Sequence, residues 1–468
     1  MGGAASRAAS GAATGGTRRL VLRLGAGVAG AGAAAACTAG QPAGSSQDSG
    51  AQRPAQRPVT LQVWEHALFK WREDVGQQIT DPLLAANPWL TLDVSVPAGN
   101  AWEKFQASSA AGTPPDTYTQ AGYWAQQDLV DGHTISLERY LKASRVLRKA
   151  DLWESLRRDL EFEGHLTSIP FAPDTRILFT HVENARKAGL DPQKPPAKWS
   201  EIEGASLNAF RGAAGTVEHI GWYPFLGSGG PYLWMVPYWQ IGGELLNADR
   251  TKITIANERA TRALSWLKRV VDRQGGYQAI EEFRKRFTST AGESVFMEGG
   301  TTFLYATLSS RGEQFNLRAP TMQFTVATYP LPDEGGTTAN YGGIWGLPIA
   351  KGSKHQDETW RFIEHVTSPE HNLKFALRFD RVPIRESTTR SQDYIGNDRG
   401  RALQAEEMKK RRQVIHAPGS GEMLPHQDVM TPVLKGEQSI QDALAEKERL
   451  LQQILDTYLA RAKDLKLS

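Results

Sequence analysis

The protein has 468 residues, of which 40% are hydrophobic and 22% charged, and this composition is typical of a folded chain of about two or three domains. Its 54 Lys and Arg nearly balance its 51 Asp and Glu, and the net charge of +3 argues against a nucleic-acid partner or a polybasic membrane surface. A mean hydropathy of −0.44 excludes a multi-spanning membrane protein, and the single cysteine excludes both an intramolecular disulfide and a thiolate zinc site.

The first 36 residues have the order of a secretory signal peptide. Arg18 and Arg19 precede a weakly hydrophobic, Gly/Ala-rich stretch, which resembles a twin-arginine export signal. Because this stretch ends in small residues before Cys37, we expect Cys37 to become the lipidated first residue of an exported protein, anchored to the outer face of the cell membrane or periplasmic. A cleaved signal without lipid and a buried structural cysteine are the alternatives. Residues 37–58 are predicted to be a flexible tether.

The chain after the tether alternates between strand and helix patterns. Residues 59–64 and 90–96 are predicted strands, and apolar residues at helical spacing predict a helix over residues 69–84. Strands that alternate with helices indicate an α/β fold, with a mainly parallel sheet and helices on both of its faces.

The later helices show both apolar periodicity and capping residues. Ser and Asn before an apolar stripe mark helix starts, and Pro is favoured at the first helical position. The predicted helices cover residues 259–272 after the cap Asn257, residues 358–366, a helix that starts at Pro369 after the cap Ser368, and residues 440–463.

No motif of a metal or nucleophilic site is present in the sequence. There is no H-E-x-x-H and no Walker loop, and Ser228 lacks the leading glycine of G-x-S-x-G. His355, His365 and His371 lie in or beside predicted helices and are expected to be solvated, so we predict no metal site and no cofactor. A glycosidase with two carboxylates needs no local motif and stays open.

Aromatic residues gather in turn-like and strand-end segments rich in Gly, Pro and Asp. A sugar ring offers a flat C–H face and a rim of hydroxyls, which suit aromatic plates and polar side chains. For any single residue, packing in the core is the simpler explanation, but the set favours a ligand cleft. Trp266 and Trp360, on helix stripes, are assigned to the core. The set comprises Trp64, Tyr118, Tyr123, Trp124, Trp222, Tyr223, Trp234, Tyr238, Trp239, Tyr341 and Trp345.

Four groups of short motifs follow one another along the chain. They are Gly112–Asp116; Ile169–Thr180 with Pro195–Glu201; Ile241–Asn247 with Phe296–Gly299; and Tyr341–Lys354 with Thr359–Ile363 and Thr367–Glu370. In this order they resemble the extracellular solute-binding proteins of family 1, the receptors of ABC sugar importers and relatives of maltodextrin-binding protein. Phe179 and Thr180 depart from the Tyr-Asn pair of that family.

The resemblance implies a two-lobed periplasmic-binding-protein fold of type II, with a ligand cleft between the lobes. By matching order, lobe 1 would comprise residues 59–173 and 331–383. Lobe 2 would comprise residues 174–330 and 384–468.

The resemblance also places candidate ligand-binding residues at the cleft. Asp174 and Arg176 would sit at a crossover between the lobes, where they could hold a sugar or simply pair with each other. Gly342 and Gly343 would let the backbone approach the ligand, and Trp345 would act as a plate. The candidates are Trp64, His66, Tyr118, Trp124, Asp174, Arg176, Trp222, Tyr223, Trp234, Tyr238, Glu298, Tyr341, Gly343, Trp345 and Arg381.

The function implied is that of a substrate-binding component of an ABC importer. Such a monomer binds a sugar or oligosaccharide and delivers it to permease subunits in the membrane, without catalysis. A secreted carbohydrate-active enzyme and a sugar-sensing receptor are the alternatives.

Overall fold

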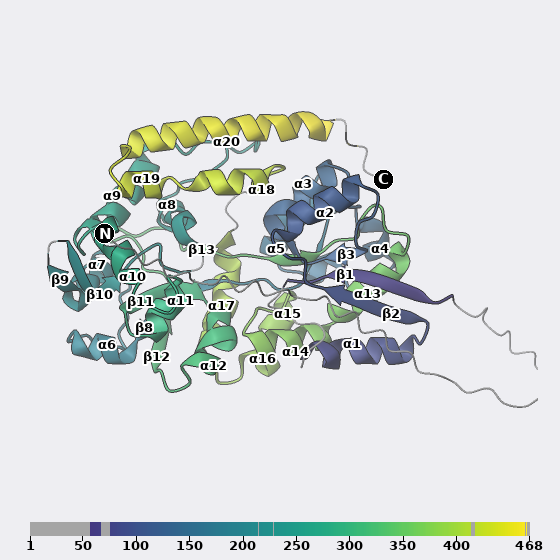
Figure 1. Ribbon diagram of the computed structural model, residues 1–468, viewed down its shortest axis with the longest axis horizontal. Coiled ribbons are helices and arrows are strands. Elements are labelled where there is room, and N and C mark those ends of the chain that lie inside the picture. The colour runs from purple at the N-terminus through teal and green to yellow at the C-terminus, as the bar shows by residue number, and fades with distance from the viewer. Residues whose placement is uncertain are drawn as a thin grey trace, which may run out of the picture. The chain divides into compact units, whose positions relative to one another are not determined.

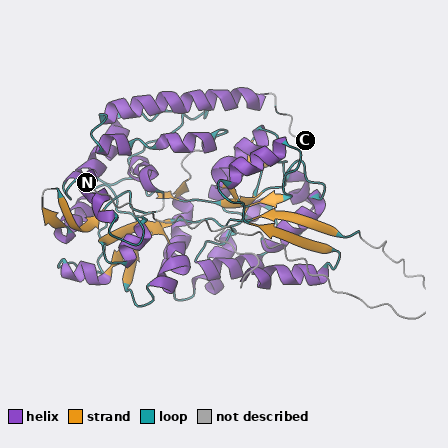
Figure 2. Cartoon of the chain, viewed as in Figure 1, coloured by secondary structure: helices purple, strands orange, loops and turns teal. Residues whose placement is uncertain are grey.

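Two separate hydrophobic cores divide the described chain into two lobes, each with a main sheet on which helices pack (Figures 1 and 2). The computed structural model describes residues 57–66, 75–213, 215–227, 229–412, 417–463 and 465. The predicted signal peptide, Cys37, most of the tether and Ser228 lie outside these residues.

Lobe 1 contains β1 (Val59–Trp64), α1 (Val75–Ala86), β2 (Leu90–Ser95), α2 (Ala101–Ala110), β3 (Thr117–Tyr118), β4 (Gln120–Ala121), α3 (Ala125–Val130), α4 (Glu138–Ala143), α5 (Glu154–Leu160), β5 (Glu161–Phe162), β6 (His165–Leu166), β7 (Ile169–Pro170), β14 (Trp345–Leu347), α13 (Gln356–Val366) and α14 (Pro369–Phe379). Its main sheet is parallel, with the order β2-β1-β3. Leu61 and Val63 bury one face of β1, which confirms the alternating pattern. Trp64 therefore stands at the carboxyl end of a central strand, the edge at which open parallel sheets bind ligands.

A second, antiparallel sheet of lobe 1 has the order β4-β14-β7. In it Trp345 pairs with Ala121, and Leu347 pairs with Ile169. This pairing brings three segments that are distant in sequence to the same end of the lobe.

Lobe 2 contains β8 (Arg176–His181), α6 (Val182–Lys187), α7 (Trp199–Ala209), β9 (Arg211–Ala213), β10 (Thr216–Trp222), α8 (Met235–Gln240), α9 (Glu258–Asp272), α10 (Tyr277–Arg284), α11 (Gly292–Met297), β11 (Thr301–Thr307), α12 (Asn316–Arg318) and β12 (Phe324–Ala327). Its sheet has the order β12-β8-β11-β10-β9. Only β10 and β11 are parallel, because β8 runs antiparallel to both β11 and β12. The sheet of this lobe is therefore mixed and not mainly parallel as predicted.

The predicted helices are confirmed together with their caps. Asn257 accepts a hydrogen bond from the Ala260 amide at the start of α9, and Ser368 accepts one from the His371 amide at the start of α14. In the first predicted helix, the described part begins at Val75 and ends at Ala86.

The chain passes between the lobes at three places. Ala172 packs in the core of lobe 1 and Ile177 in that of lobe 2, while Ala339 packs in lobe 2 and Ile344 in lobe 1. The last passage lies between Met408 in lobe 1 and Ala417 in lobe 2, beyond α15 (Glu386–Thr389), α16 (Gln392–Ile395) and α17 (Arg399–Glu407). Near the boundaries expected at residues 331 and 384, Leu331 forms a bridge with Lys198, and Ile384 packs in the core of lobe 1. The boundaries themselves stay a prediction.

The C-terminal part of the chain lies along both lobes (Figure 1). It contains α18 (Ser420–Met423), α19 (Met430–Leu434) and α20 (Ile440–Lys463), the predicted last helix. Leu444, Leu451 and Leu455 of α20 join the core of lobe 2, whereas Tyr458 and Ala462 pack with Leu129, Val130 and Phe162 of lobe 1. One helix therefore ties the two lobes together. Of the described helices, none is long and apolar enough to cross a membrane.

Phe179 offers a test of the core of lobe 2. It is fully buried on β8, and its ring contacts those of Phe296, Phe315 and Phe324. We expect Phe179→Ala to lower the free energy of unfolding by about 3–5 kcal/mol, because the cavity adds to the lost burial. Urea unfolding measures this change. Leu317→Ala, at a site that is 66% exposed, is the control and should change stability by less than about 0.5 kcal/mol.

Candidate ligand-binding site

Two adjoining pockets form a single groove at the junction of the lobes. The central pocket, of about 170 Å³, is lined by Ala121, Tyr123, Asp174, Arg176, Tyr341, Gly342, Gly343, Ile344, Trp345, Ser420, Leu424 and Gln427. The lobe 1 pocket, of about 210 Å³, is lined by Trp64, Glu65, His66, Gly99, Asn100, Ala101, Trp102, Tyr118, Thr119, Ala121, Tyr123, Trp124 and Trp345. They share Ala121, Tyr123 and Trp345. The central pocket lies between the lobes, since it is lined by Trp345 of lobe 1 and by Ser420, Leu424 and Gln427 of the C-terminal part.

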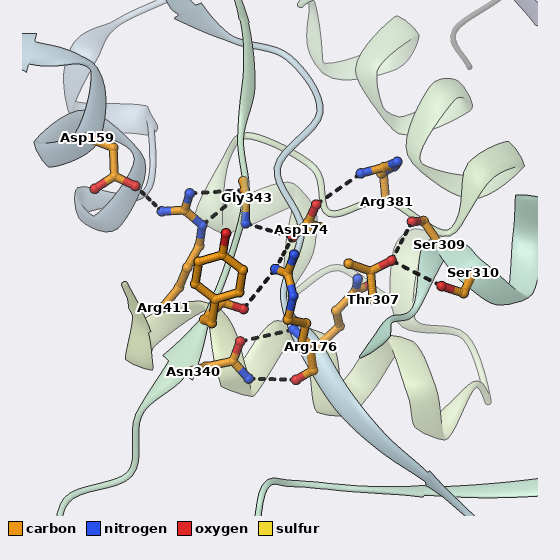
Figure 3. Close-up of polar contacts among 12 residues, drawn as sticks. Asp159, Asp174, Arg176, Thr307, Ser309, Ser310, Asn340, Gly343, Arg381 and Arg411 are labelled. Atoms are coloured by element: carbon orange, nitrogen blue, oxygen red, sulfur yellow. Dashed lines mark hydrogen bonds and ion pairs between the residues drawn. The ribbon is translucent and has the colours of Figure 1, made fainter. Parts of the chain in front are cut away.

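The floor of the central pocket is a buried ion-pair network around Asp174 (Figure 3). Asp174 Oδ1 accepts hydrogen bonds from Arg176 Nη1 at 3.0 Å and from the Gly343 amide at 2.7 Å, and Oδ2 accepts one from Arg381 Nη1 at 3.1 Å. Burial alone would raise the pKa of Asp174, but the charges of Arg176 and Arg381 and the amide of Gly343 hold this pKa below its ordinary value. Asp174 is therefore a carboxylate whose two oxygens are both bonded.

Arg411 completes the network from the third passage between the lobes. Its side chain is fully buried, pairs with Asp159, and donates from Nη2 to the Gly343 carbonyl at 3.0 Å (Figure 3). A Cβ on Gly342 would lie 2.4 Å from the Asp174 carbonyl oxygen and 2.5 Å from Arg411 Cγ. We predicted that Gly342 and Gly343 would let the backbone lie close to a ligand. At Gly342 the backbone instead lies close to Asp174 and Arg411 of the protein itself.

Aromatic rings line the groove beside this floor. Trp102 stacks on Trp124, with ring centroids 3.3 Å apart and planes 10° from parallel. The ring of His66 lies 4.5 Å from that of Trp345. These rings and Trp64 are all partly exposed, so part of their surface is available to a ligand.

Two titratable groups of the groove are neutral near pH 7. Burial, with a smaller contribution from the charge of Arg381, lowers the pKa of His66 below its ordinary value. Burial raises the pKa of Tyr123 to about 12, so its hydroxyl keeps its proton and can donate a hydrogen bond.

The structure brings nine of the fifteen candidate residues into the groove: Trp64, His66, Tyr118, Trp124, Asp174, Arg176, Tyr341, Gly343 and Trp345. Arg381 lies directly behind it, bonded to Asp174 and at 2.7 Å to Glu313. Tyr118 is 1% exposed, so it supports the wall more than it presents a surface.

The other five candidates lie away from the groove, four of them in the core of lobe 2. Trp222 is fully buried beside Trp266 and Tyr329. Tyr238 donates to the Glu244 carbonyl, Trp234 donates to that of Gln427, and Tyr223 is 4% exposed. Glu298 is exposed and accepts a hydrogen bond from the Thr288 amide. The buried rings are covered by protein on both faces, which explains why they do not reach the groove.

Trp102 and Gln427 line the groove although the sequence did not single them out. Trp102 follows the cap Asn100 in the first turn of α2, where a ring can point from the helix end into a cleft. The Gln427 side-chain amide is buried and has no hydrogen-bond partner among the described residues. No sequence pattern marks it. Within the same residues, no group of three His, Cys, Asp or Glu is placed to hold a metal ion.

Comparisons with known proteins agree with this architecture. The family model for bacterial extracellular solute-binding protein matches residues 79–398. The mannotriose-bound structure of CpMnBP1 superposes with a TM-score of 0.72 at 20% identity, over 84% of this chain and 100% of that one. The sugar-binding protein MalE from Xanthomonas citri gives a TM-score of 0.72 at 20% identity, over 87% and 100%. At this identity the likeness establishes the two-lobed periplasmic-binding-protein fold.

A short stretch also matches curated relatives. The sn-glycerol-3-phosphate-binding periplasmic protein UgpB of Salmonella paratyphi A is 46% identical over 39 residues, which are 8% of this chain and 9% of UgpB. The chain therefore matches about a tenth of the length of this relative.

Asp174→Asn tests the floor of the groove. Removing the charge takes away the carboxylate that Arg176 and Arg381 share and leaves Glu313 as the carboxylate beside Arg381. We therefore expect a loss of about 3–5 kcal/mol in the free energy of unfolding at pH 7. Because the folded pKa of Asp174 lies below its ordinary value of 3.8, its contribution is complete above that value and is lost as the pH falls through the folded pKa. Urea unfolding between pH 2 and pH 7 should show the two proteins converging in acid.

Glu386→Gln is the matched control, because Glu386 pairs with Arg390 on the half-exposed surface of a helix. It should cost less than about 1 kcal/mol at every pH. If Asp174→Asn and Glu386→Gln lowered the free energy of unfolding equally at pH 7, Asp174 would not be the residue that stabilises the buried ion-pair network.

Proposed function

The chain belongs to the bacterial extracellular solute-binding proteins, and on this premise we propose that it binds a sugar or oligosaccharide in the groove between its lobes. The observation that carries the proposal is the pairing of partly exposed aromatic rings with polar groups along two adjoining pockets. Relatives of the same fold bind mannotriose and other sugars.

The groove offers both kinds of contact that a sugar needs. Trp64, Trp102 and Trp345 supply flat apolar surface for C–H faces, while the Tyr123 hydroxyl and the Gln427 amide supply donors and acceptors for the hydroxyl rim. The two pockets share a wall at Trp345, so linked sugar rings could occupy both.

Catalysis on the sugar is the alternative to binding alone. A glycosidase needs a carboxylic acid that donates a proton beside the scissile bond. The pKa of Asp174 is lowered, and its oxygens are bonded to Arg176, Arg381 and Gly343, so it cannot serve as that acid at neutral pH. With Asp174 held in its ion-pair network, Glu65 is the other carboxylate among the described lining residues, one short of the pair that a glycosidase needs. We therefore propose capture without cleavage, and product analysis after incubation with oligosaccharides tests this directly.

The proposal extends to delivery. A ligand held between the lobes would favour their closure about the three passages, and the closed lobes would present the sugar to the permease of an ABC importer. The lipid anchor proposed at Cys37 would keep the protein close to that permease. A receptor that reports the sugar to a membrane sensor would use the same groove, and gene neighbours that encode permeases separate the two roles.

Trp345→Ala tests the sugar plate. We first expect one of a panel of mono- and oligosaccharides to raise the melting temperature, since saturation at a hundred times Kd adds about 2.7 kcal/mol of stability. For that sugar, Trp345→Ala should weaken calorimetric affinity by some 2 kcal/mol, about thirtyfold, because the exposed part of the ring would stack on the ligand.

Trp360→Ala provides the control for this measurement. Trp360 is 8% exposed in the core of lobe 1 and stacks on Tyr140, away from the groove. Its removal should lower the melting temperature of the free protein and leave affinity unchanged. The opposite pattern, in which Trp345→Ala lowers only the melting temperature, would remove Trp345 from the site.

Cys37→Ser tests the anchor. Each buried CH₂ of an acyl chain contributes about 0.8 kcal/mol to membrane binding, which a net charge of +3 cannot replace. We expect the variant to move from the membrane fraction to the soluble fraction of cells that process lipoproteins, with sugar affinity unchanged. A variant that still sediments with membranes would show that Cys37 is not the anchor.

A further inference from the structure

A buried carboxylate stands behind the aromatic wall of the lobe 1 pocket. Asp128 lies on α3, is fully buried, and accepts hydrogen bonds from three side chains. Its Oδ1 accepts from Trp102 Nε1 at 3.0 Å, and its Oδ2 accepts from Gln120 Nε2 at 2.6 Å and from the Tyr118 hydroxyl. Two of the donors, Trp102 and Tyr118, line the pocket.

Trp102 depends on this carboxylate for its orientation. The residue lies in the first turn of α2, and its ring is only partly buried. Its indole N–H bonds Asp128 and its ring stacks on Trp124, so one edge and one face are fixed. Trp124 in turn packs on the backbone of α18, because a Cβ on Gly421 would lie 1.7 Å from Trp124 Cε3.

We propose that Asp128 is a positioning residue for the groove: its ionised carboxylate holds Trp102 in the orientation that stacks on a sugar ring, and protonation of this carboxylate loosens the plate and weakens binding. The inference rests on the proposed sugar-binding function. It adds a residue that touches no ligand, and a dependence of affinity on pH.

The chemistry of the carboxyl group explains the dependence. An ionised Asp128 accepts all three hydrogen bonds, whereas a protonated one carries a hydrogen that needs an acceptor among the same partners. The Tyr118 hydroxyl can accept it only by giving up its own role as a donor, so protonation rearranges the set of bonds to which Trp102 belongs. Burial raises the pKa of Asp128 to about 6, against the opposing effect of the hydrogen bonds from Tyr118, Gln120 and Trp102. Protonation therefore falls within the range in which the folded protein can be studied.

Other titratable groups lie on the elements that pack around α3. They include Tyr118 on β3, Tyr123 before α3, Asp131 and His133 after it, Glu154, Arg157, Arg158 and Asp159 on α5, Glu161 on β5, Glu422 on α18, and Tyr458 and Arg461 on α20. Of these, Tyr118 bonds Asp128 directly, and the charge of Asp131 adds to the raised pKa. Asp159 is paired with Arg411, and Asp131 is bonded to Arg461 at 3.1 Å.

Asp128→Asn is the first variant to measure. The probes are maltotriose and mannotriose, with affinity measured by calorimetry from pH 5 to pH 8. Wild-type affinity should be constant above pH 7 and should fall several-fold as the pH drops below about 6. Because the amide cannot accept all three hydrogen bonds, Asp128→Asn should bind about tenfold more weakly at pH 7.5, with a flat pH profile.

Asp131→Asn is the matched control. Asp131 follows Asp128 by one turn, is half-buried, and bonds Arg461 and not Trp102. It should leave the affinity at pH 7.5 unchanged and keep the fall in affinity at low pH. The midpoint of that fall should move only slightly, to lower pH, because the charge of Asp131 is the smallest of the stated contributions to the pKa of Asp128.

A double-mutant cycle identifies Trp102 as the residue through which Asp128 acts. Trp102→Ala should weaken binding, and adding Asp128→Asn to it should cause no further loss, since the plate is already absent. If Asp128→Asn fails to fold, Trp102→Phe replaces it, because it keeps an aromatic ring but removes the N–H that Asp128 accepts. This variant should also bind more weakly and lose the pH dependence.

The outcomes separate this inference from the function on which it rests. If the wild type binds a probe and Asp128→Asn keeps both its affinity and its pH profile, the positioning role is wrong and sugar binding stands. Additive losses in the cycle would also overturn it. If the wild type binds neither these probes nor any sugar of the panel, the proposed function fails first and the inference falls with it.

Discussion

The structure depends on one buried carboxylate, Asp174, which binds three separate parts of the chain. Arg176 starts β8 of lobe 2, Arg381 follows α14 of lobe 1, and Gly343 lies on the return passage between the lobes. A charge buried to this extent is stable only where partners surround it, so the network fixes how the passages lie against one another. The same groups form the floor of the central pocket, which couples the junction of the lobes to the place where a ligand would bind.

A second connection lies across the groove from this floor. The Tyr458 hydroxyl near the end of α20 donates to Glu422 at 2.6 Å and accepts from Gln127 of lobe 1. On the neighbouring α18, Gly421 packs on the ring of Trp124. The aromatic wall of lobe 1 is therefore bounded by a segment whose apolar residues belong to lobe 2. A change in the distance between the lobes would therefore move α18 against the ring of Trp124. In turn, a ligand that binds at this wall would favour one distance between the lobes.

The sequence predicted the fold far better than the lining of the groove. Alternation and caps are local, so β1, β2 and the helices α9, α13, α14 and α20 were predicted from the sequence, and the family motifs indicated the two lobes. Trp64 was placed because it ends a predicted strand, and Trp345 because the family motif beside Gly342 and Gly343 implies a place at the cleft. Trp222 and Tyr238 occupy similar Gly-rich surroundings, yet tertiary packing covers them completely. Trp102, Gln427 and Asp128 were missed because their roles depend on neighbours distant in sequence.

The charges around the groove also restrict its ligand. Among the described lining residues, Arg176 and His66 are the basic groups and Asp174 and Glu65 the acidic ones. Arg176 is paired with Asp174, and the lowered pKa of His66 leaves its ring neutral near pH 7. An anionic ligand would therefore meet two carboxylates and a cation that is already compensated, at a cost that grows as water is excluded. A neutral sugar meets no such opposition and can use the Gln427 amide, a donor and an acceptor that the surrounding residues leave unmatched. The groove favours uncharged hydroxyl-bearing rings for the same reason that its floor is stable: its arginine is already paired.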